Sequence, residues 1–148
     1  LGDIAPHRYK FEVTESMAMA NPERTTEILK RLSGMGFKIA IDDFGTGYSS
    51  LAYLYRFPFD MLKVDRSFVI RLGAGQEAQE IVRTIVGLGS ALKKQVLAEG
   101  IEQETEAAQL QALGVHLGQG WLFSRALPAD RATAFIAAHT QAAGVPAR

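Results

Sequence analysis

The sequence contains no cysteine in its 148 residues. This absence excludes disulfide bonds, thiolate metal sites and cysteine nucleophiles. The protein ligands of any metal must therefore be oxygen atoms or histidine nitrogens. A chain without cysteine also fits a reducing compartment.

The sequence also lacks an excess of charge of either sign and lacks long apolar runs. Sixteen basic and sixteen acidic residues give a formal net charge of zero, so bulk charge predicts no polymeric nucleic acid partner and leaves a small charged ligand open. No apolar run approaches the roughly 20 residues of a membrane span, and no basic start followed by an apolar segment resembles a signal peptide. We therefore expect no membrane segment in this chain and a cytoplasmic location.

What the sequence does contain is a regular alternation of strand and helix patterns. With 47% hydrophobic residues, the chain can form one domain with a substantial core. The patterns predict strands at 8–15, 37–43, 61–65, 95–99 and 115–123, and helices at 22–34, 49–55, 78–93, 104–113 and 128–142. Because parallel strands need crossover connections and each connection here is helical, we predict a parallel sheet covered by helices. An open doubly wound sheet and a closed barrel both fit this pattern.

The second predicted strand ends in two adjacent carboxylates, Asp42 and Asp43, which a glycine-rich loop follows. Neighbouring carboxylates repel each other, so near neutral pH both remain ionised most easily when a cation lies beside them. This pair favours a divalent metal site. The alternative is that the two residues cap the next helix or are solvated in a turn.

Strand alternation separates apolar residues from charged ones. The apolar set is predicted to face the helices: Phe11, Val13, Ile39, Ile41, Leu62, Val64, Val96 and Ala98. The opposite set is mostly charged: Lys10, Glu12, Thr14, Lys38, Asp42, Lys63, Asp65 and Glu99, with Gln119 closing the series. Apart from Lys10 and Lys38, it lies near the carboxyl ends of the strands. In a barrel this set would point inward, where charge is costly to bury unless the groups pair or bind a metal. We therefore favour a metal site, with a structural ion-pair network as the alternative.

Five segments together resemble the EAL domain family in order and spacing: Phe-Glu-Val-Thr-Glu-Ser at 11–16, Asp-Asp-Phe-Gly-Thr-Gly-Tyr-Ser-Ser-Leu at 42–51, Leu-Lys-Val-Asp at 62–65, Ala-Glu-Gly-Ile-Glu at 98–102 and Gly-Gln-Gly at 118–120. The resemblance runs from about Arg8 to Pro128. It implies an α/β fold, a TIM-type (β/α)8 barrel of which about five C-terminal βα units are present. Residues 1–143 would then be the C-terminal part of the domain and 144–148 a tail. Members of this family are phosphodiesterases that hydrolyse cyclic di-GMP.

The resemblance implies a two-metal site held by Glu12, Asp42, Asp43 and Glu99, in which Asp42 bridges the two ions. Oxygen ligands suit Mg²⁺ or Mn²⁺, whereas Ca²⁺ is expected to bind unproductively and to inhibit. Catalytic roles are implied for Lys63 and Glu99. Lys63 would orient or deprotonate the water or neutralise the phosphoryl charge, and the alternative is a salt bridge to a carboxylate.

The resemblance also implies residues that anchor a loop and residues that contact the substrate. Loop anchoring is implied for Glu15 and Asp65. Substrate contacts are implied for Asp43, Glu102 and Gln119. The alternative for Glu102 and Gln119 is an ordinary supporting or capping role.

Trp121 and Phe123 are interpreted as core side chains rather than as stacking platforms for a base. The three histidines share no spacing typical of metal ligands, and we expect them to be incidental: His7, His116 and His139.

The resemblance begins partway through the family pattern. The Glu-Ala-Leu signature and an asparagine on the next motif-bearing strand, both ligands of the first metal, are expected upstream of Leu1. We therefore expect the complete domain to hydrolyse cyclic di-GMP to the linear dinucleotide and this stretch alone to be inactive. The alternatives are a non-catalytic receptor for cyclic di-GMP and a dimerisation module. We also expect a homodimer, and an upstream sensory or cyclase-like domain is possible.

Overall fold

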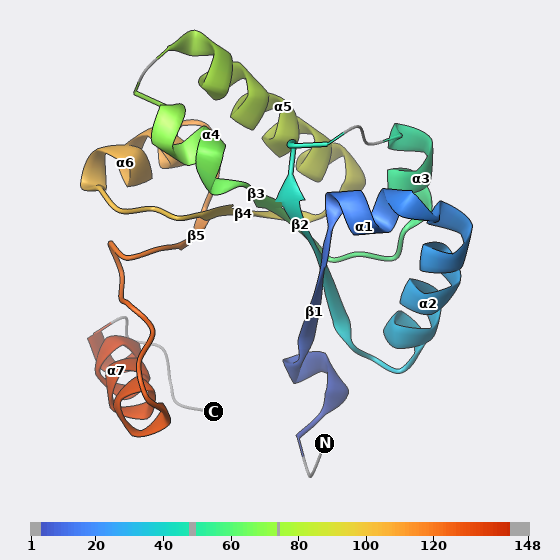
Figure 1. Ribbon diagram of the computed structural model, residues 1–148. Coiled ribbons are helices and arrows are strands. Elements are labelled where there is room, and N and C mark those ends of the chain that lie inside the picture. The colour runs from blue at the N-terminus through green and yellow to red at the C-terminus, as the bar shows by residue number, and fades with distance from the viewer. Residues whose placement is uncertain (1–3, 48–49, 74, 143–148) are drawn as a thin grey trace.

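The computed structural model of the chain describes residues 4–47, 50–73 and 75–142. The predicted tail at 144–148 and the start of the predicted helix at Ser49 lie outside these residues. Five strands form one parallel sheet in the order β1 (Lys10–Thr14), β2 (Lys38–Phe44), β3 (Met61–Val64), β4 (Gln95–Glu99) and β5 (Leu117–Gln119) (Figure 1). Each strand lies beside the next one along the chain. A doubly wound sheet reverses its strand order at a switch point, so this consecutive order is that of a barrel segment.

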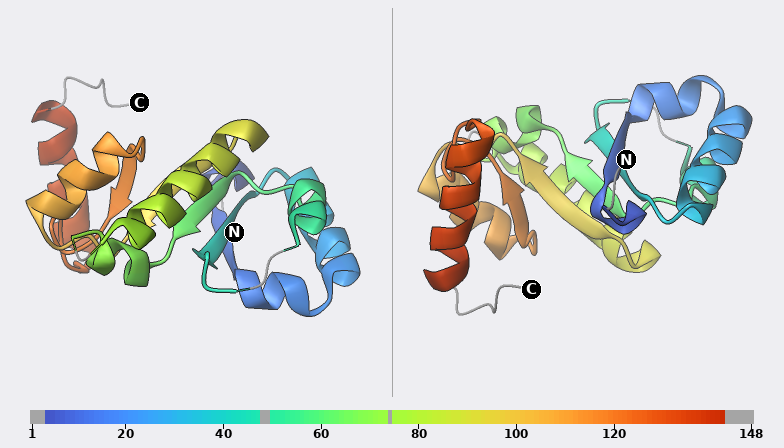
Figure 2. Two further views of the ribbon diagram at one scale, coloured as in Figure 1. Left: turned by 90° about the horizontal axis from the view of Figure 1, so that it is seen from above. Right: turned by 90° about the horizontal axis from the view of Figure 1, so that it is seen from below.

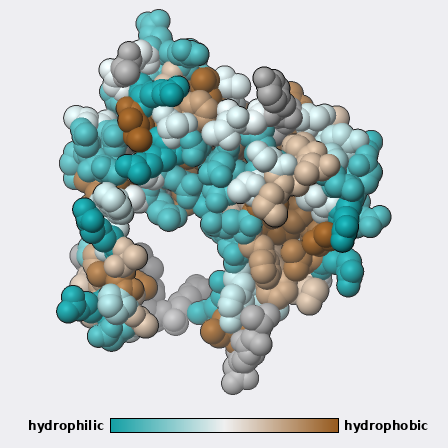
Figure 3. All heavy atoms as spheres, viewed as in Figure 1, coloured by the Kyte–Doolittle hydropathy of each residue, from teal (hydrophilic) through white to brown (hydrophobic). Residues whose placement is uncertain are grey.

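Helices connect the strands on one side of the curved sheet (Figures 1 and 2). A short 3-10 helix, Pro6–Arg8, precedes β1, and the α-helices are α1 (Glu15–Ala20), α2 (Pro22–Gly34), α3 (Leu51–Arg56), α4 (Arg66–Arg71), α5 (Gln76–Leu92), α6 (Glu104–Ala112) and α7 (Ala129–Ala142). The last helix, α7, lies apart from the others, and a space-filling view shows open space between it and the segment that begins β1 (Figure 3). None of the helices in the described ranges combines the length and apolar character needed to cross a membrane.

Local signals explain where the longer helices begin. The Asn21 side chain accepts a hydrogen bond from the Arg24 backbone N–H at 3.1 Å, and Pro22 occupies the first position of α2. Gln103 and Glu106 form a capping box at the start of α6. These helices match the predicted ranges within a few residues.

Two six-residue helices, α1 and α4, were absent from the sequence prediction. Each directly follows a strand and begins at a capping side chain: Thr14 accepts from the Met17 N–H, and Asp65 accepts from the Ser67 N–H. Six residues are too few to show a helical period. The equally short α3 was predicted because Ser49 and Pro58 bound it, whereas only the caps signalled α1 and α4.

The predicted strand at 115–123 was too long, because β5 ends at Gln119. The chain turns there: the Leu122 N–H donates to the Ile101 carbonyl at 3.0 Å, and the Phe123 N–H donates to the Gly120 carbonyl at 3.1 Å. A Cβ at Gly120 would overlap the backbone of Ile101, so glycine is required where the two segments meet.

The core lies between the sheet and the helices, as strand alternation predicted. Ile39, Ile41, Leu62 and Val64 are fully buried there. β1 is an edge strand of the described sheet, and Phe11, predicted to face the helices, remains 44% exposed.

Asp60 joins the amino ends of β2 and β3. Its carboxylate accepts a hydrogen bond from the Ile39 N–H at 3.0 Å and pairs with the Lys38 ammonium at 2.8 Å, and its own N–H donates to the Ile39 carbonyl at 2.8 Å. Burial by itself raises the pKa of Asp60, but the hydrogen bonds from Lys38 and Ile39 outweigh it and lower the pKa. The ionised carboxylate therefore stabilises the fold.

Asp60→Ala is expected to lower the free energy of unfolding at pH 7 by about 1–2 kcal/mol, because it leaves the buried Ile39 N–H without its acceptor. A lowered folded-state pKa gives stability that is present above the unfolded-state value of about 4 and is lost as pH falls through the folded-state pKa. The difference from wild type should therefore shrink in acid. Urea unfolding at pH 7 and pH 3 measures both effects, and a difference independent of pH would contradict the assigned role.

Candidate functional site

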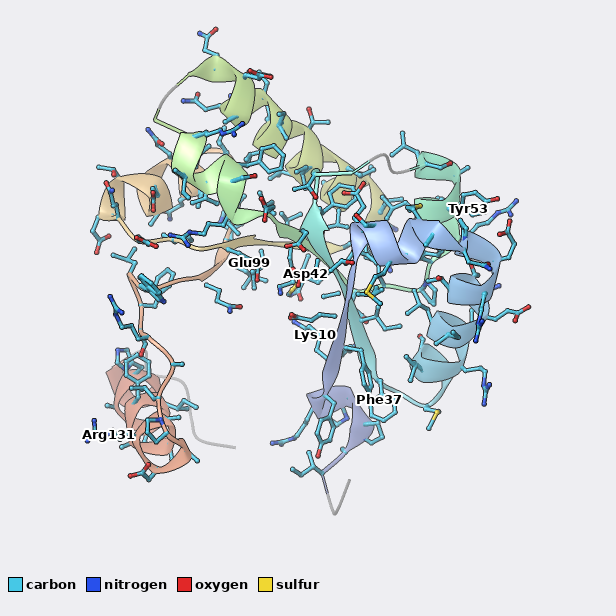
Figure 4. The ribbon with its side chains drawn as sticks, in the orientation of Figure 1. Lys10, Phe37, Asp42, Tyr53, Glu99 and Arg131 are labelled. Carbon is cyan, nitrogen blue, oxygen red and sulfur yellow. The ribbon has the colours of Figure 1, made fainter. Side chains whose placement is uncertain are left out.

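Charged side chains from four neighbouring strands meet on the face of the sheet opposite the helices (Figure 4). The Nζ atom of Lys63 on β3 lies 2.6 Å from Oε2 of Glu12 on β1, 3.0 Å from Oδ1 of Asp42 on β2 and 2.7 Å from Oε1 of Glu99 on β4. The Lys63 side chain is only 4% exposed. The structure thus brings together four residues that strand alternation had placed on one face.

Lys63 is a fixed positive charge in this arrangement. Burial by itself lowers the pKa of the Lys63 ammonium, but its hydrogen bonds to Glu12, Glu99 and Asp42 outweigh burial and raise the pKa above the usual range. The carboxylate salt bridge expected as the alternative for Lys63 is the arrangement observed. A protonated Lys63 can orient a water or neutralise a phosphoryl oxygen, and it is a poor proton acceptor.

Asp42, Asp43 and Glu99 form a group of carboxylates that suits a divalent cation. Each offers one oxygen, and the three oxygens lie within 4.8 Å of one another, as ligands about 2.1–2.5 Å from a shared ion would. Burial, followed by the charges of Asp42 and Asp65, raises the pKa of Asp43, and burial likewise raises the pKa of Glu99. This clustering disfavours the ionised state of both groups, and a cation would relieve it.

A break in β2 brings Asp43 into this group. Strict alternation would point Asp42 and Asp43 to opposite faces, but the β2–β3 register shifts between Ile41 and Phe44, and Asp43 has a left-handed φ of 52°. The Asp43 N–H donates to Asp42 Oδ1 at 3.0 Å, which fixes the two residues relative to each other.

Glu15 and the glycine loop after Asp43 are joined directly. The Glu15 side chain is buried, and its Oε2 accepts hydrogen bonds from the Gly45 N–H at 2.8 Å and the Gly47 N–H at 3.3 Å. Gly45 has a φ of 100°, and a Cβ there would lie 2.9 Å from the Phe68 ring. Asp65, the other residue implied to anchor this loop, accepts instead from the Ser67 N–H at the start of α4.

Glu15→Ala should lower the free energy of unfolding by about 2–4 kcal/mol, because two backbone N–H groups lose a charged acceptor that is almost fully buried. Glu15→Gln keeps one side-chain oxygen and should cost less. Thermal unfolding of both variants measures the order. Equal loss in the two variants would show that side-chain packing, rather than hydrogen bonding to the loop, is the contribution of Glu15.

A groove of about 590 Å³ adjoins the carboxylates. Its lining includes Asp43 and Glu99 together with the predicted substrate residues Glu102 and Gln119. It also includes two arginines that the sequence analysis did not identify, Arg66 and Arg125. The only sequence signal for Arg66 was its position directly after Asp65 at a strand end.

The interpretation of Trp121 and Phe123 as core residues was wrong. Trp121 is 55% exposed and lines the groove, and Phe123 is 52% exposed. β5 ends before both residues and the chain turns at Gly120, so Trp121 and Phe123 are not part of the predicted strand.

Comparison with characterised sequences places these features in a family. The sequence profile of the EAL domain matches residues 2–126. The cyclic di-GMP phosphodiesterase NbdA of Pseudomonas aeruginosa is 45% identical over 139 residues, which are 94% of this chain and 18% of NbdA. The bifunctional diguanylate cyclase/cyclic di-GMP phosphodiesterase MucR of the same bacterium is 44% identical over 134 residues, 90% of this chain and 20% of MucR.

Solved structures show the same likeness. The PaMucR phosphodiesterase in its c-di-GMP complex superposes with a TM-score of 0.85 at 44% identity, over 87% of this chain and 52% of that one. Klebsiella pneumoniae BlrP1, solved in manganese/cy-diGMP and calcium/cy-diGMP complexes, gives a TM-score of 0.77 at 40% identity, over 82% of this chain and 31% of BlrP1. This chain therefore spans about half of the PaMucR structure and a smaller share of NbdA, MucR and BlrP1. The five βα units predicted from the sequence are confirmed as a portion of a TIM-type barrel, and the chain belongs to the EAL domain family.

Proposed function

We propose that the domain containing this chain is a metal-dependent phosphodiesterase that hydrolyses cyclic di-GMP to the linear dinucleotide. The observation that carries this proposal is the group of Asp42, Asp43 and Glu99 oxygens within 4.8 Å of one another, beside a buried Lys63. Relatives named as cyclic di-GMP phosphodiesterases support the substrate.

Asp42, Asp43 and Glu99 would hold divalent cations together with Glu12, and Asp42 would bridge two of them. The donor set fits, because it consists only of carboxylate oxygens, which Mg²⁺ and Mn²⁺ prefer. A bound Mg²⁺ or Mn²⁺ supplies the Lewis acidity that activates water and offsets the charge of a phosphodiester. Ca²⁺, with longer bonds and looser geometry, is proposed to bind and inhibit.

This chain's own side chains perform the remaining steps of the proposed reaction. Protonated Lys63 orients the attacking water or offsets charge on the phosphoryl oxygens. Glu99 would bind a metal ion and also accepts a hydrogen bond from the Lys63 ammonium. Glu102 and Gln119 line the groove next to the carboxylates, where they would contact the nucleotide. Glu15 fixes the loop that follows Asp43.

Hydrolysis assays on the full-length protein test this function. Chromatography of the products should show the linear dinucleotide with Mg²⁺ or Mn²⁺ and little product with Ca²⁺ or after chelation. Undiminished hydrolysis after chelation, or no hydrolysis with any divalent metal, would refute the proposal. The isolated 148-residue stretch is proposed to be inactive, and Mg²⁺-dependent hydrolysis by that stretch alone would overturn this part.

A second candidate function is a receptor that binds cyclic di-GMP without cleaving it. Lys63 favours this function, because its ammonium contacts three carboxylates and offsets part of their charge without a metal. Binding of cyclic di-GMP that survives chelation, with no turnover when Mg²⁺ returns, would support the receptor over the enzyme.

We also propose that the chain functions in the cytoplasm as part of a larger homodimeric protein. Leu51 and Tyr55 on α3 are 65% and 79% exposed, which suits a contact between two copies. The name of MucR, which covers a cyclase activity as well, supports an additional cyclase-like domain. Residues 1–143 remain our proposed boundary for the EAL part. Sedimentation of the full-length protein with Leu51→Glu tests the dimer, which this substitution should dissociate.

A further inference from the structure

We propose that Arg66 is a positioning residue that sets the Glu102 carboxylate and the Trp121 ring to receive a guanine base of the substrate. This inference rests on the proposed function and deepens it. Arg66, at the start of α4, forms a salt bridge through Nη2 with Oε1 of Glu102. Its guanidinium carbon also lies 5.9 Å from the centroid of the Trp121 ring. One side chain therefore contacts two residues that line the groove.

The backbone at Gly100 leaves room for the Arg66 side chain. Gly100 has a φ of 70°, and a Cβ there would lie 2.6 Å from Cδ and 2.9 Å from Cβ of Arg66. The aliphatic part of Arg66 thus lies over Gly100, between Glu99 of the carboxylate group and Glu102. Any other residue at position 100 would displace Arg66.

Backbone hydrogen bonds fix the segments that Arg66 connects. The Ile101 N–H donates to the Gln119 carbonyl at 3.1 Å, and the Leu122 N–H donates to the Ile101 carbonyl at 3.0 Å. Both bonds are made by Ile101, the neighbour of Glu102, and their partners Gln119 and Leu122 lie on either side of Trp121 in the chain. Arg66 adds a side-chain link between the two segments, so it limits how far Glu102 and Trp121 can move relative to each other.

The part of the groove lined by Glu102 and Trp121 suits a guanine base. With Oε1 paired to Arg66, the second oxygen of Glu102 can accept hydrogen bonds, and guanine offers N–H donors at its base-pairing edge where adenine has an acceptor. The exposed Trp121 ring offers an aromatic surface for the base. Arg125 lies 4.2 Å from the Trp121 centroid and has no carboxylate within salt-bridge distance in the described part of the chain, so its charge can attract the anionic ligand.

Kinetics of Arg66→Ala in the full-length protein test this role. We expect KM for cyclic di-GMP to rise about tenfold with little change in kcat, because a Glu102 carboxylate that Arg66 no longer positions loses its hydrogen bond to the base in substrate binding and not in the chemical step. Arg66→Lys keeps the charge and should recover part of the affinity. Hydrolysis of bis(p-nitrophenyl) phosphate, a diester without bases, should be unchanged. Discrimination between cyclic di-GMP and cyclic di-AMP should fall.

Two further measurements separate this role from a structural one. Arg83→Ala removes an exposed arginine of α5 and should leave KM unchanged. Fluorine NMR of protein labelled with 5-fluorotryptophan, with Trp121→Phe to assign the resonance, should show a shift on adding cyclic di-GMP to wild type that Arg66→Ala reduces. An unchanged KM, or an equal loss toward both diesters, would overturn the inference.

The inference can fail independently of the proposed function. If the wild-type protein does not hydrolyse cyclic di-GMP, the phosphodiesterase proposal fails, and calorimetric affinity for cyclic di-GMP still tests Arg66. A lower affinity of Arg66→Ala would then support the positioning role. Equal affinity of both proteins, or binding by neither, would overturn it.

Discussion

Asp42→Asn is expected to reduce kcat for cyclic di-GMP hydrolysis by about 10³-fold or more, because the stabilisation supplied by a bound metal is worth several kcal/mol and each 1.36 kcal/mol is a factor of ten. Asp42 belongs to the group of three carboxylates and also contacts Lys63 at 3.0 Å. The substitution removes a negative charge where the proposed bridging ligand stands. Chromatographic assay of the full-length protein with saturating Mg²⁺ measures the loss.

This substitution is nearly isosteric and should leave the fold intact. The asparagine carbonyl oxygen can still accept the hydrogen bond from the Asp43 N–H that Asp42 Oδ1 accepts now. The matched control is Asp130→Asn, the same change on the exposed first turn of α7, which should retain full activity. A variant at Asp42 that folds normally and keeps more than about a tenth of wild-type kcat would be incompatible with a bridging role.

Lys63→Met is expected to lower the free energy of unfolding of the metal-free protein by about 3 kcal/mol, because it leaves the Asp42 and Glu99 carboxylates without their buried cationic partner. We take the lower end of the range for broken buried pairs, since Glu12 is 46% exposed and partly screened by water. Mg²⁺ should restore more stability to this variant than to wild type. The kcat should also fall by about 10²-fold or more, as for the loss of a charge-stabilising donor.

Denaturant unfolding with and without Mg²⁺ measures the stability change. Lys38→Met is the matched control, because Lys38 is 49% exposed and pairs with Asp60 away from the carboxylate group. Lys38→Met should lower the free energy of unfolding by no more than about 1 kcal/mol, and this difference should not depend on Mg²⁺. If Lys63→Met were as stable as wild type without metal, the three carboxylates would not depend on Lys63 for charge compensation.

Much of the fold followed from the sequence because its strands alternate clearly. Ile39, Ile41, Leu62 and Val64 are apolar at every second position, and all four are buried against the helices. Short elements were harder to predict. α1 and α4 are too short to show a helical period, and the apolar residues after Gln119 resembled a continuing strand although a tight contact at Gly120 turns the chain.

Strand alternation predicted only part of the carboxylate site. Alternation placed Glu12, Asp42, Lys63 and Glu99 on one face, and all four converge in the structure. It could not place Asp43, because the register shift that turns its side chain depends on pairing between β2 and β3.

The groove depended still more on contacts between distant segments. Arg66 meets Glu102 and Trp121 only after α4, β4 and the turn beyond β5 come together. Such contacts leave no period in the sequence.

We propose that Asp42, Asp43 and Glu99 hold the divalent cations of a phosphodiesterase. Electron paramagnetic resonance of free Mn²⁺ tests it most directly, because it counts the ions bound by the full-length protein in the presence of cyclic di-GMP. We expect about two Mn²⁺ per EAL domain in wild type and loss of at least one in Asp42→Asn. The same Mn²⁺ stoichiometry and affinity in both proteins would contradict it.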